Sequence, residues 1–139
     1  MKNLRSMLFA FTVLLLATAA QAQTTNVKAN IPFDFVVGDH AYPAGEYTIK
    51  SMSQTSPALR IDNRDESEKG VTLSNSCNQL QPAEGTTLVF RHLGDSYFLY
   101  QIWTEGKTSG RELPMSKVEV QIAKNNKPEL LIVAANISH

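Results

Sequence analysis

The sequence predicts a mainly β domain, either an antiparallel sandwich or a partly open barrel of about seven strands, with one short helix near the C-terminus. Apolar and polar residues alternate with a period of two along most of residues 27–103, as in strands that bury one face. Glycine and proline separate these runs and mark turns. Only the segment 114–125 carries a helix-start signal.

We expect residues 1–22 to be a signal peptide. Lys2 and Arg5 give a positive start, and Ala20-Gln21-Ala22 has the small-x-small pattern of a signal-peptidase site. The apolar run 7–20 has 14 residues, whereas a membrane-spanning helix needs roughly 20. The residue directly after the expected cleavage site is Gln23 and not a cysteine, so a lipid anchor is not expected either.

Cleavage between Ala22 and Gln23 leaves residues 23–139 as a single β-rich domain. We expect this domain in the periplasm or outside the cell, with no membrane span after cleavage. Losing Lys2 and Arg5 leaves 11 basic against 13 acidic residues, a formal charge of −2. That balance argues against a nucleic-acid partner, because such proteins usually present a basic face.

Cys77 is the only cysteine. The domain therefore has no internal disulfide and must be stabilised by its hydrophobic core. An unpaired, unreactive thiol and a disulfide between two chains both remain open for this residue.

The first predicted strand covers residues 27–37, in which odd-numbered positions are apolar. Pro32 has no amide hydrogen for a sheet, which places this strand at an edge or at a bulge. The sequence Pro43-Ala44-Gly45 then predicts a turn.

Three shorter strands follow, with the pairs Tyr47 and Ile49, Leu59 and Ile61, and Val71 and Leu73 expected to point inward. The connection 62–70 contains four carboxylates, which raises the possibility of a calcium site. Its spacing does not match the twelve-residue calcium loop, and it includes two basic residues. We therefore expect a solvated hairpin tip.

The clearest hairpin runs from Thr86 to Trp103 and turns at Gly94-Asp95. A two-residue loop fixes the register, so we expect His92 opposite Tyr97 and Val89 opposite Tyr100. One face would then carry Leu88, Phe90, Tyr97, Leu99 and Trp103. The other would carry Val89, Phe98, Tyr100 and Ile102, a candidate binding patch if it stays exposed.

Residues 115–125 are the candidate cover for that second face. Ser116 and Glu119 have the spacing of a capping box and predict a helix of about three turns, with Met115, Val118 and Ile122 on one side. A strand remains the alternative here, because β-branched residues alternate along the segment. The run 129–137 is apolar at nearly every position and predicts a buried final strand.

The chain contains no common catalytic motif, and we predict no catalytic, cofactor-binding or metal-binding residues. His92 is the best-placed histidine, with Asp95 nearby, but we expect it to form a cross-strand aromatic pair with Tyr97 instead of a catalytic site. Two roles are also open for the adjacent residues Arg111 and Glu112. The guanidinium either binds a ligand oxyanion or ties a loop to its neighbours.

Several segments together resemble a family of small exported proteins of uncharacterised function from environmental Gram-negative bacteria. They are Ile31-Pro32-Phe33-Asp34-Phe35, Pro43-Ala44-Gly45-Glu46-Tyr47, Leu88-Val89-Phe90 with Gly94-Asp95 and Tyr97-Phe98-Leu99, and Gly110-Arg111-Glu112-Leu113-Pro114. These are turn and core segments, so the resemblance implies no activity for any residue. It does favour a helix after Pro114.

Three functions are compatible with these features. The first is an exported noncatalytic β-domain that binds a protein or a small ligand, or has a structural role in the envelope. The second is a small β-barrel holding an apolar ligand. The third is a secreted hydrolase that uses His92.

Export makes the first testable prediction. When the chain is expressed with its leader in a Gram-negative host, the exported protein should begin at Gln23, because Ala20-Gln21-Ala22 offers a signal-peptidase pattern directly after the apolar run. Intact-mass spectrometry of the periplasmic fraction measures this. A mass that still includes the leader would contradict the prediction.

Overall fold

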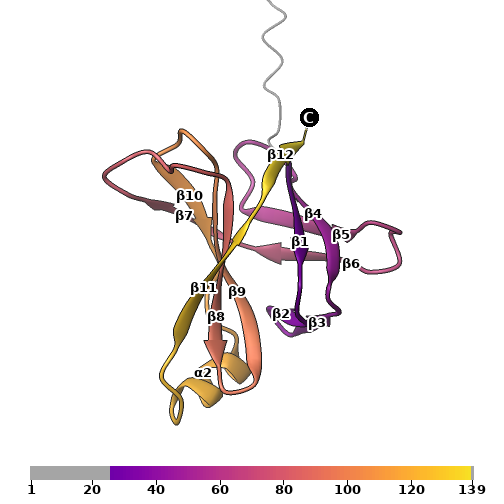
Figure 1. Cartoon of the computed structure of the whole chain (residues 1–139), viewed down its shortest axis with the longest axis vertical. Coiled ribbons are helices and arrows are strands. Elements are labelled where there is room, and N and C mark those ends of the chain that lie inside the picture. The colour runs from indigo at the N-terminus through magenta and orange to yellow at the C-terminus, as the bar shows by residue number, and fades with distance from the viewer. Residues whose placement is uncertain (1–25, 139) are drawn as a thin grey trace, which may run out of the picture.

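The structure, a computed structural model, describes residues 26–138. It has twelve strands in two stacked sheets that do not close into a barrel, and one short helix near the C-terminus (Figure 1). The predicted mainly β, sandwich-like fold is thus confirmed. Within residues 26–138 no helix is long and apolar enough to cross a membrane. The expected leader and its cleavage site at Ala22 and Gln23 lie outside the described residues.

The first sheet is entirely antiparallel and has the strand order β12-β1-β4-β5-β6. Its strands are β1 (Asn26–Ile31), β4 (Gly45–Ser51), β5 (Ala58–Asn63), β6 (Lys69–Leu73) and β12 (Asn136–Ser138). The strand β1 lies between β4 and the C-terminal strand β12, so the two ends of the domain pair with each other.

The second sheet has the order β11-β8-β9-β10-β7. These strands are β7 (Asn75–Asn78), β8 (Thr87–Leu93), β9 (Ser96–Trp103), β10 (Ser109–Glu112) and β11 (Glu129–Ala134). A small ribbon made of β2 (Phe35–Val37) and β3 (His40–Tyr42) joins it, with β2 parallel to β9 at Val36 and Phe98.

The chain passes directly from one sheet to the other at both edges. The strand β6 continues into β7 through Ser74, whose amide and hydroxyl both donate to the Pro57 carbonyl at 2.9 Å. The strand β11 continues into β12 through Ala135, whose amide donates to the Thr86 carbonyl at 2.9 Å. Figure 1 shows the second crossing as the yellow segment that runs diagonally between the sheets.

The segment predicted as one strand over residues 27–37 forms two strands in different sheets, and this part of the prediction is wrong. The break falls at Pro32, Phe33 and Asp34. Pro32 cannot donate to a neighbouring strand, and the Asp34 carboxylate accepts from the Ala44 amide at 2.8 Å, which fixes the bend. The proline therefore ends the first strand rather than bulging it.

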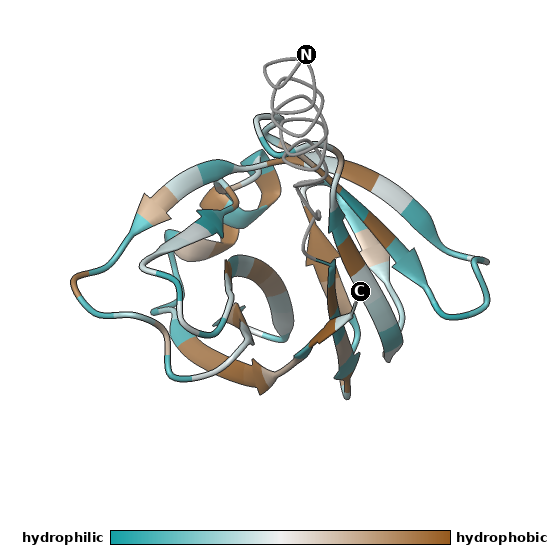
Figure 2. Ribbon diagram, turned by 90° about the horizontal axis from the view of Figure 1, so that it is seen from above, coloured by the Kyte–Doolittle hydropathy of each residue, from teal (hydrophilic) through white to brown (hydrophobic). Residues whose placement is uncertain are grey.

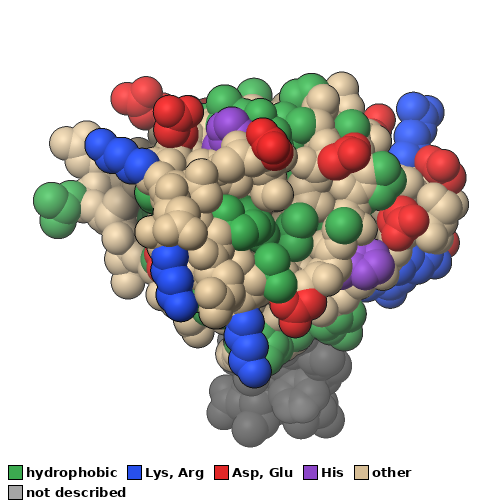
Figure 3. Space-filling view, turned by 90° about the horizontal axis from the view of Figure 1, so that it is seen from below, with side chains coloured by type: hydrophobic (Ala, Val, Ile, Leu, Met, Phe, Trp, Pro, Cys, Tyr) green, Lys and Arg blue, Asp and Glu red, His purple; other side chains and the backbone are tan. Residues whose placement is uncertain are grey.

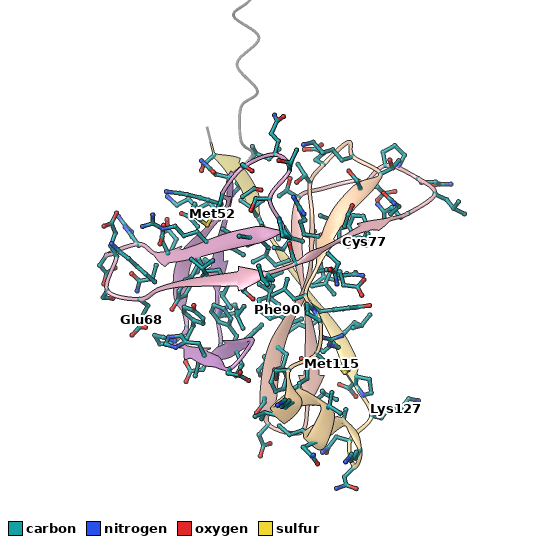
Figure 4. All side chains as sticks on the ribbon, turned by 180° about the vertical axis from the view of Figure 1, so that it is seen from behind. Met52, Glu68, Cys77, Phe90, Met115 and Lys127 are labelled. Atoms are coloured by element: carbon teal, nitrogen blue, oxygen red, sulfur yellow. The ribbon has the colours of Figure 1, made fainter. Side chains whose placement is uncertain are left out.

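The core lies between the sheets and is built from large side chains of both. Phe35 packs edge-on against Tyr47, with ring centroids 5.0 Å apart, and against Phe90 at 5.7 Å. All three are almost fully buried. Figure 4 shows Phe90 at the centre of the molecule, where the two sheets cross.

The β8–β9 hairpin has the predicted register near its turn but not farther along. His92 pairs with Tyr97, and Phe90 with Leu99, as expected. The register then shifts by one residue, so that Val89 pairs with Gln101 and not with Tyr100. This bulge turns the next residue, Ile102, into the core.

The predicted binding patch is therefore not an exposed surface. Val89, Phe98 and Ile102 are 7%, 2% and 6% exposed, and Tyr100 is half-buried. Ile102 faces the core because of the bulge. On the opposite face, Tyr100 lies beneath the guanidinium of Arg91, whose carbon Cζ is 4.1 Å from the ring centroid.

The predicted helix is confirmed as α2 (Lys117–Ala123), against the strand alternative. The Ser116 hydroxyl accepts from the Glu119 amide at 3.2 Å, as in a capping box. The Glu119 side chain is 3% exposed and accepts from Arg91 Nε at 2.5 Å. An ion pair thus attaches this helix to the outer face of β8.

The apolar residues of the α2 segment do not cover the hairpin as predicted. Of the three residues predicted to face the hairpin, Met115 and Val118 are exposed and Ile122 is half-buried, because Glu119 occupies the inward position of the helix. Figure 3, which views the molecule from below, shows hydrophobic side chains gathered on this end of the surface.

The prediction that the final strand is buried is also wrong. Leu130, Leu131 and Ile132 in β11 are 63%, 40% and 66% exposed, because β11 is an edge strand. Figure 2 colours much of this outer strand as hydrophobic. In β6, an edge strand of the first sheet, Val71 and Leu73 are exposed rather than inward-facing. In β6 and β11, the position of the strand at a sheet edge thus determines which residues are exposed, and the hydrophobic pattern does not.

The Arg91–Glu119 pair leads to a prediction about stability. Replacing Glu119 with Gln should lower the free energy of unfolding by about 3–5 kcal/mol, because it leaves a buried guanidinium without a counter-charge. Denaturant unfolding followed by circular dichroism measures the change. The double variant R91M/E119L should recover most of the loss, since it removes both charges. Equal stability of E119Q and the wild type would contradict the prediction.

Candidate functional site

The main hollow of the described structure is a cleft between the two sheets, with a volume of about 540 Å³. The strands β1, β4 and β5 form one wall and β7, β9 and β10 the other. The 52–57 loop after β4 contributes to the rim. Figure 4 marks the two sides: Met52 begins that loop, and Cys77 lies on β7.

The floor of the cleft is apolar. It consists of side chains from both sheets that are at most 6% exposed, namely Val27, Ile49, Leu59 and Ile102. Val27 pairs with Ile49 across β1 and β4, so these two lie side by side. Ile102 reaches the floor from the opposite sheet only because of the bulge in the β8–β9 hairpin. The floor is thus the open end of the hydrophobic core.

The rim is polar and rich in hydroxyl groups. Its uncharged polar residues are Ser51, Gln54, Thr55, Ser76, Thr104 and Ser109. Only two lining residues are charged, Lys107 and Arg111, and both are cationic. No acidic residue lines the cleft, although the predicted exported domain carries a formal charge of −2.

Arg111 connects the two walls. It lies on β10, where it pairs with Ile102 of β9 and Ser76 of β7. Its Nη2 donates to the carbonyl of Ser56 in the 52–57 loop at 3.1 Å. One of the two predicted roles, the tying of a loop to its neighbours, is therefore observed. The ligand-binding role stays a prediction.

The adjacent Glu112 does not pair with Arg111. Its carboxylate accepts from Gln101 Nε2 at 3.1 Å, which joins β10 to β9. Consecutive residues of a strand point to opposite faces, so Glu112 lies on the face of β10 away from Arg111. The acidic neighbour seen in the sequence thus does not neutralise the cleft.

The carboxylates that pair with basic side chains lie elsewhere. On the first sheet, Glu46 accepts from Lys28 at 2.7 Å, and Asp62 accepts from Arg60 at 2.9 Å. The hydrogen bond from Lys28 and its positive charge lower the pKa of Glu46 below the usual value. Lys28, Glu46 and Asp62 line a smaller hollow of about 150 Å³, together with the charged residues Lys50, Arg64 and Glu66. Its charges are already balanced, which makes it a weaker candidate for an ionic ligand.

Gly110 sets how closely β10 approaches β9. A Cβ atom at this position would lie 2.7 Å from the Ile102 carbonyl oxygen and 2.7 Å from a ring carbon of Trp103. No other residue fits there without moving the strand. Gly110 therefore fixes the wall that carries Arg111, a role the sequence did not indicate because glycine also marks turns.

Cys77 lies on β7, next to the cleft-lining Ser76, and is half-buried and unpaired. Burial raises the pKa of the thiol, and the nearby Glu112 raises it further. A raised pKa reduces the thiolate fraction at neutral pH, and thiolate is the reactive form. This environment favours an unreactive thiol over one poised for chemistry.

His92 sits in an aromatic stack, and Glu129 of β11 is its direct neighbour on the other side. Its ring lies parallel to Tyr97, with centroids 4.3 Å apart, and Tyr97 stacks in turn on Phe33 at 4.0 Å. The cross-strand aromatic pair is thus confirmed. In the described part of the chain, no hydrogen bond or ion pair joins His92 to Glu129 or to any other carboxylate.

The acidic connection 62–70 forms the tip of the β5–β6 hairpin, as predicted, but Asp62 is buried and not solvated. Its carboxylates engage basic side chains: Glu66 accepts from Lys69 at 2.9 Å, and Glu68 contacts His40 at 3.5 Å. Between Asn26 and Ser138, no three histidine, cysteine or acidic side chains come together as metal ligands would.

The close approach at Gly110 gives a testable prediction. Replacing Gly110 with Ala should destabilise the domain by about 1–3 kcal/mol, the usual cost of overpacking. Gly85→Ala is the matched control, because a Cβ there meets nothing within 4 Å. Denaturant unfolding of both variants measures the difference. Equal stability of the two would show that β10 can shift freely.

Comparisons with known proteins add no further constraint. No protein-family model, no curated protein and no solved structure matches this chain. What the cleft binds must therefore be inferred from its own residues, an apolar floor beneath a rim of hydroxyl groups and two cationic side chains.

Proposed function

We propose that this protein is an exported, noncatalytic domain that binds a small ligand between its two sheets, in the periplasm or outside the cell. The observation that carries the proposal is the cleft of about 540 Å³ with an apolar floor. Pockets for small ligands typically measure roughly 300–1,000 Å³ and combine apolar walls with a few polar groups.

The leader supports the exported location. Lys2, Arg5 and the apolar run 7–20 form the pattern of a cleaved signal peptide. The strand β1 begins at Asn26, so only a short segment separates the proposed cleavage site from the first strand. A leader of this kind can therefore be removed without cutting into the sheet.

We place the ligand in the cleft between the sheets and not inside a closed barrel. In a barrel, a ligand would lie inside a continuous wall, but these sheets do not close. The aromatic stack around His92 supports a structural role for that residue, so ligand binding is favoured over hydrolysis. The floor residues come from three strands of one sheet and from β9 of the other, and a ligand there would contact both sheets.

Blocking the cleft tests the proposal. Thr55 is an exposed rim residue on the 52–57 loop, so a tryptophan at this position should fill the mouth. We expect Thr55→Trp to weaken binding of the neutral fluorescent probe N-phenyl-1-naphthylamine by about tenfold or more, because apolar contact with the floor is lost. Titration of probe fluorescence measures the affinity.

The control is Met52→Trp, which places the same side chain on the same loop but outside the cleft lining. Met52 is exposed, so both variants should keep melting temperatures within about 4 °C of the wild type. Equal probe binding by the wild type and Thr55→Trp would contradict a ligand site in the cleft. It would place the probe on another apolar surface, such as β11.

A further inference from the structure

We infer that the ligand of the cleft is an amphipathic anion, with an oxyanion head group held by Arg111 and an apolar body on the cleft floor. This inference rests on the proposed function and names its ligand class. The juxtaposition that carries it is a guanidinium without a carboxylate partner, set beside buried aliphatic side chains.

Arg111 is unusual among the arginines of this protein. Between Asn26 and Ser138 there are four arginines. Three of them pair with carboxylates: Arg60 with Asp62 at 2.9 Å, Arg64 with Glu46 at 3.6 Å, and Arg91 with Glu119. Arg111 alone bonds instead to a backbone carbonyl, that of Ser56. A ligand oxyanion would supply the counter-charge that the other three already have.

The guanidinium keeps donors for such a ligand. It carries five N–H groups in a planar fork that matches a carboxylate or phosphate, and the Ser56 carbonyl engages only Nη2. That bond also orients the side chain across the cleft, from β10 toward the 52–57 loop. The fork is thus positioned before a ligand arrives, which reduces the entropy lost on binding.

The register places the head-group site next to the floor. Arg111 pairs directly with Ile102, and directly paired residues on neighbouring strands point to the same face, with Cβ atoms roughly 5 Å apart. An oxyanion at Arg111 therefore leaves an attached chain beside Ile102, from which Val27, Ile49 and Leu59 continue across the floor. The hydroxyl of Ser76, opposite Arg111 on β7, lines the same part of the rim.

The charged residues that line the cleft favour an anionic ligand over a cationic one. No carboxylate is among the lining residues, and the other charged one, Lys107, is also cationic. Glu112, the nearest acidic residue in sequence, is held by Gln101. A cationic amphiphile would meet the positive guanidinium of Arg111, whereas an anion gains charge-assisted hydrogen bonds from it.

Three ligands with the same hydrocarbon chain test this inference: decanoate, decanol and decyltrimethylammonium, each below its micelle-forming concentration. Their ability to displace N-phenyl-1-naphthylamine gives their relative affinities. We expect decanoate to bind about tenfold more tightly than decanol, the usual gain from a hydrogen-bonded charge pair. Decyltrimethylammonium should bind most weakly. Added salt should weaken the binding of decanoate more than that of decanol.

Replacing Arg111 with Gln should reduce the affinity for decanoate to that for decanol and leave decanol itself unchanged. Arg64→Gln is the matched control, because Arg64 is a solvent-exposed arginine outside the cleft lining. Arg111 also holds the 52–57 loop, so Arg111→Lys serves as a second variant. It keeps the charge but loses the planar fork, and should show an intermediate preference for decanoate.

The outcomes separate this inference from the proposed function. If Thr55→Trp abolishes probe binding but decanoate and decanol bind the wild type equally, the cleft binds ligands and the anionic class is wrong. If Arg111→Gln and Arg111→Lys both keep the full preference for decanoate, the head group is not held by Arg111. If Thr55→Trp leaves binding unchanged, the proposed function fails and this inference falls with it.

Discussion

The passage of the chain between the sheets at both edges is the constraint on which the rest of the structure depends. Ser74 on one side and Ala135 on the other hold the crossings through hydrogen bonds to Pro57 and Thr86. Because each crossing is a continuous stretch of backbone, the sheets cannot slide or separate at their edges. The aromatic core fills the centre, and the cleft is the space left where the sheets diverge beyond it. The proposed site is therefore a product of the topology and not of a mobile loop.

Much of the architecture follows from local sequence signals. The Gly94-Asp95 turn fixed the pairing of His92 with Tyr97, and the capping sequence at Ser116 identified α2. Both depend on residues close together in the chain, where turn and cap chemistry act directly. The period-two pattern also identified the paired strands β4 and β5, because the face they bury is a simple alternation.

What the sequence did not reveal depends on distant residues. The bulge that turns Ile102 inward has no local marker, and one extra residue exchanges the two faces of a strand beyond it. The exposure of β11 depends on its place at the sheet edge, which its apolar composition does not show. The cleft joins residues as far apart as Val27 and Arg111, so no spacing in the sequence could disclose it. The one sequence feature that pointed to this site was Arg111, for which ligand binding was one of two predicted roles.

The pairing of β1 with β12 has a consequence for how the protein matures. Asn26 lies opposite Ser138, so the first sheet gains its last strand only from the final residues of the chain. Contacts this distant in sequence form late, because the loop that joins them must close first. A chain exported from its N-terminal end, as proposed, would cross the membrane before its two ends could meet. If the domain is exported as proposed, this pairing would keep the first sheet incomplete until residues 136–138 have also crossed the membrane.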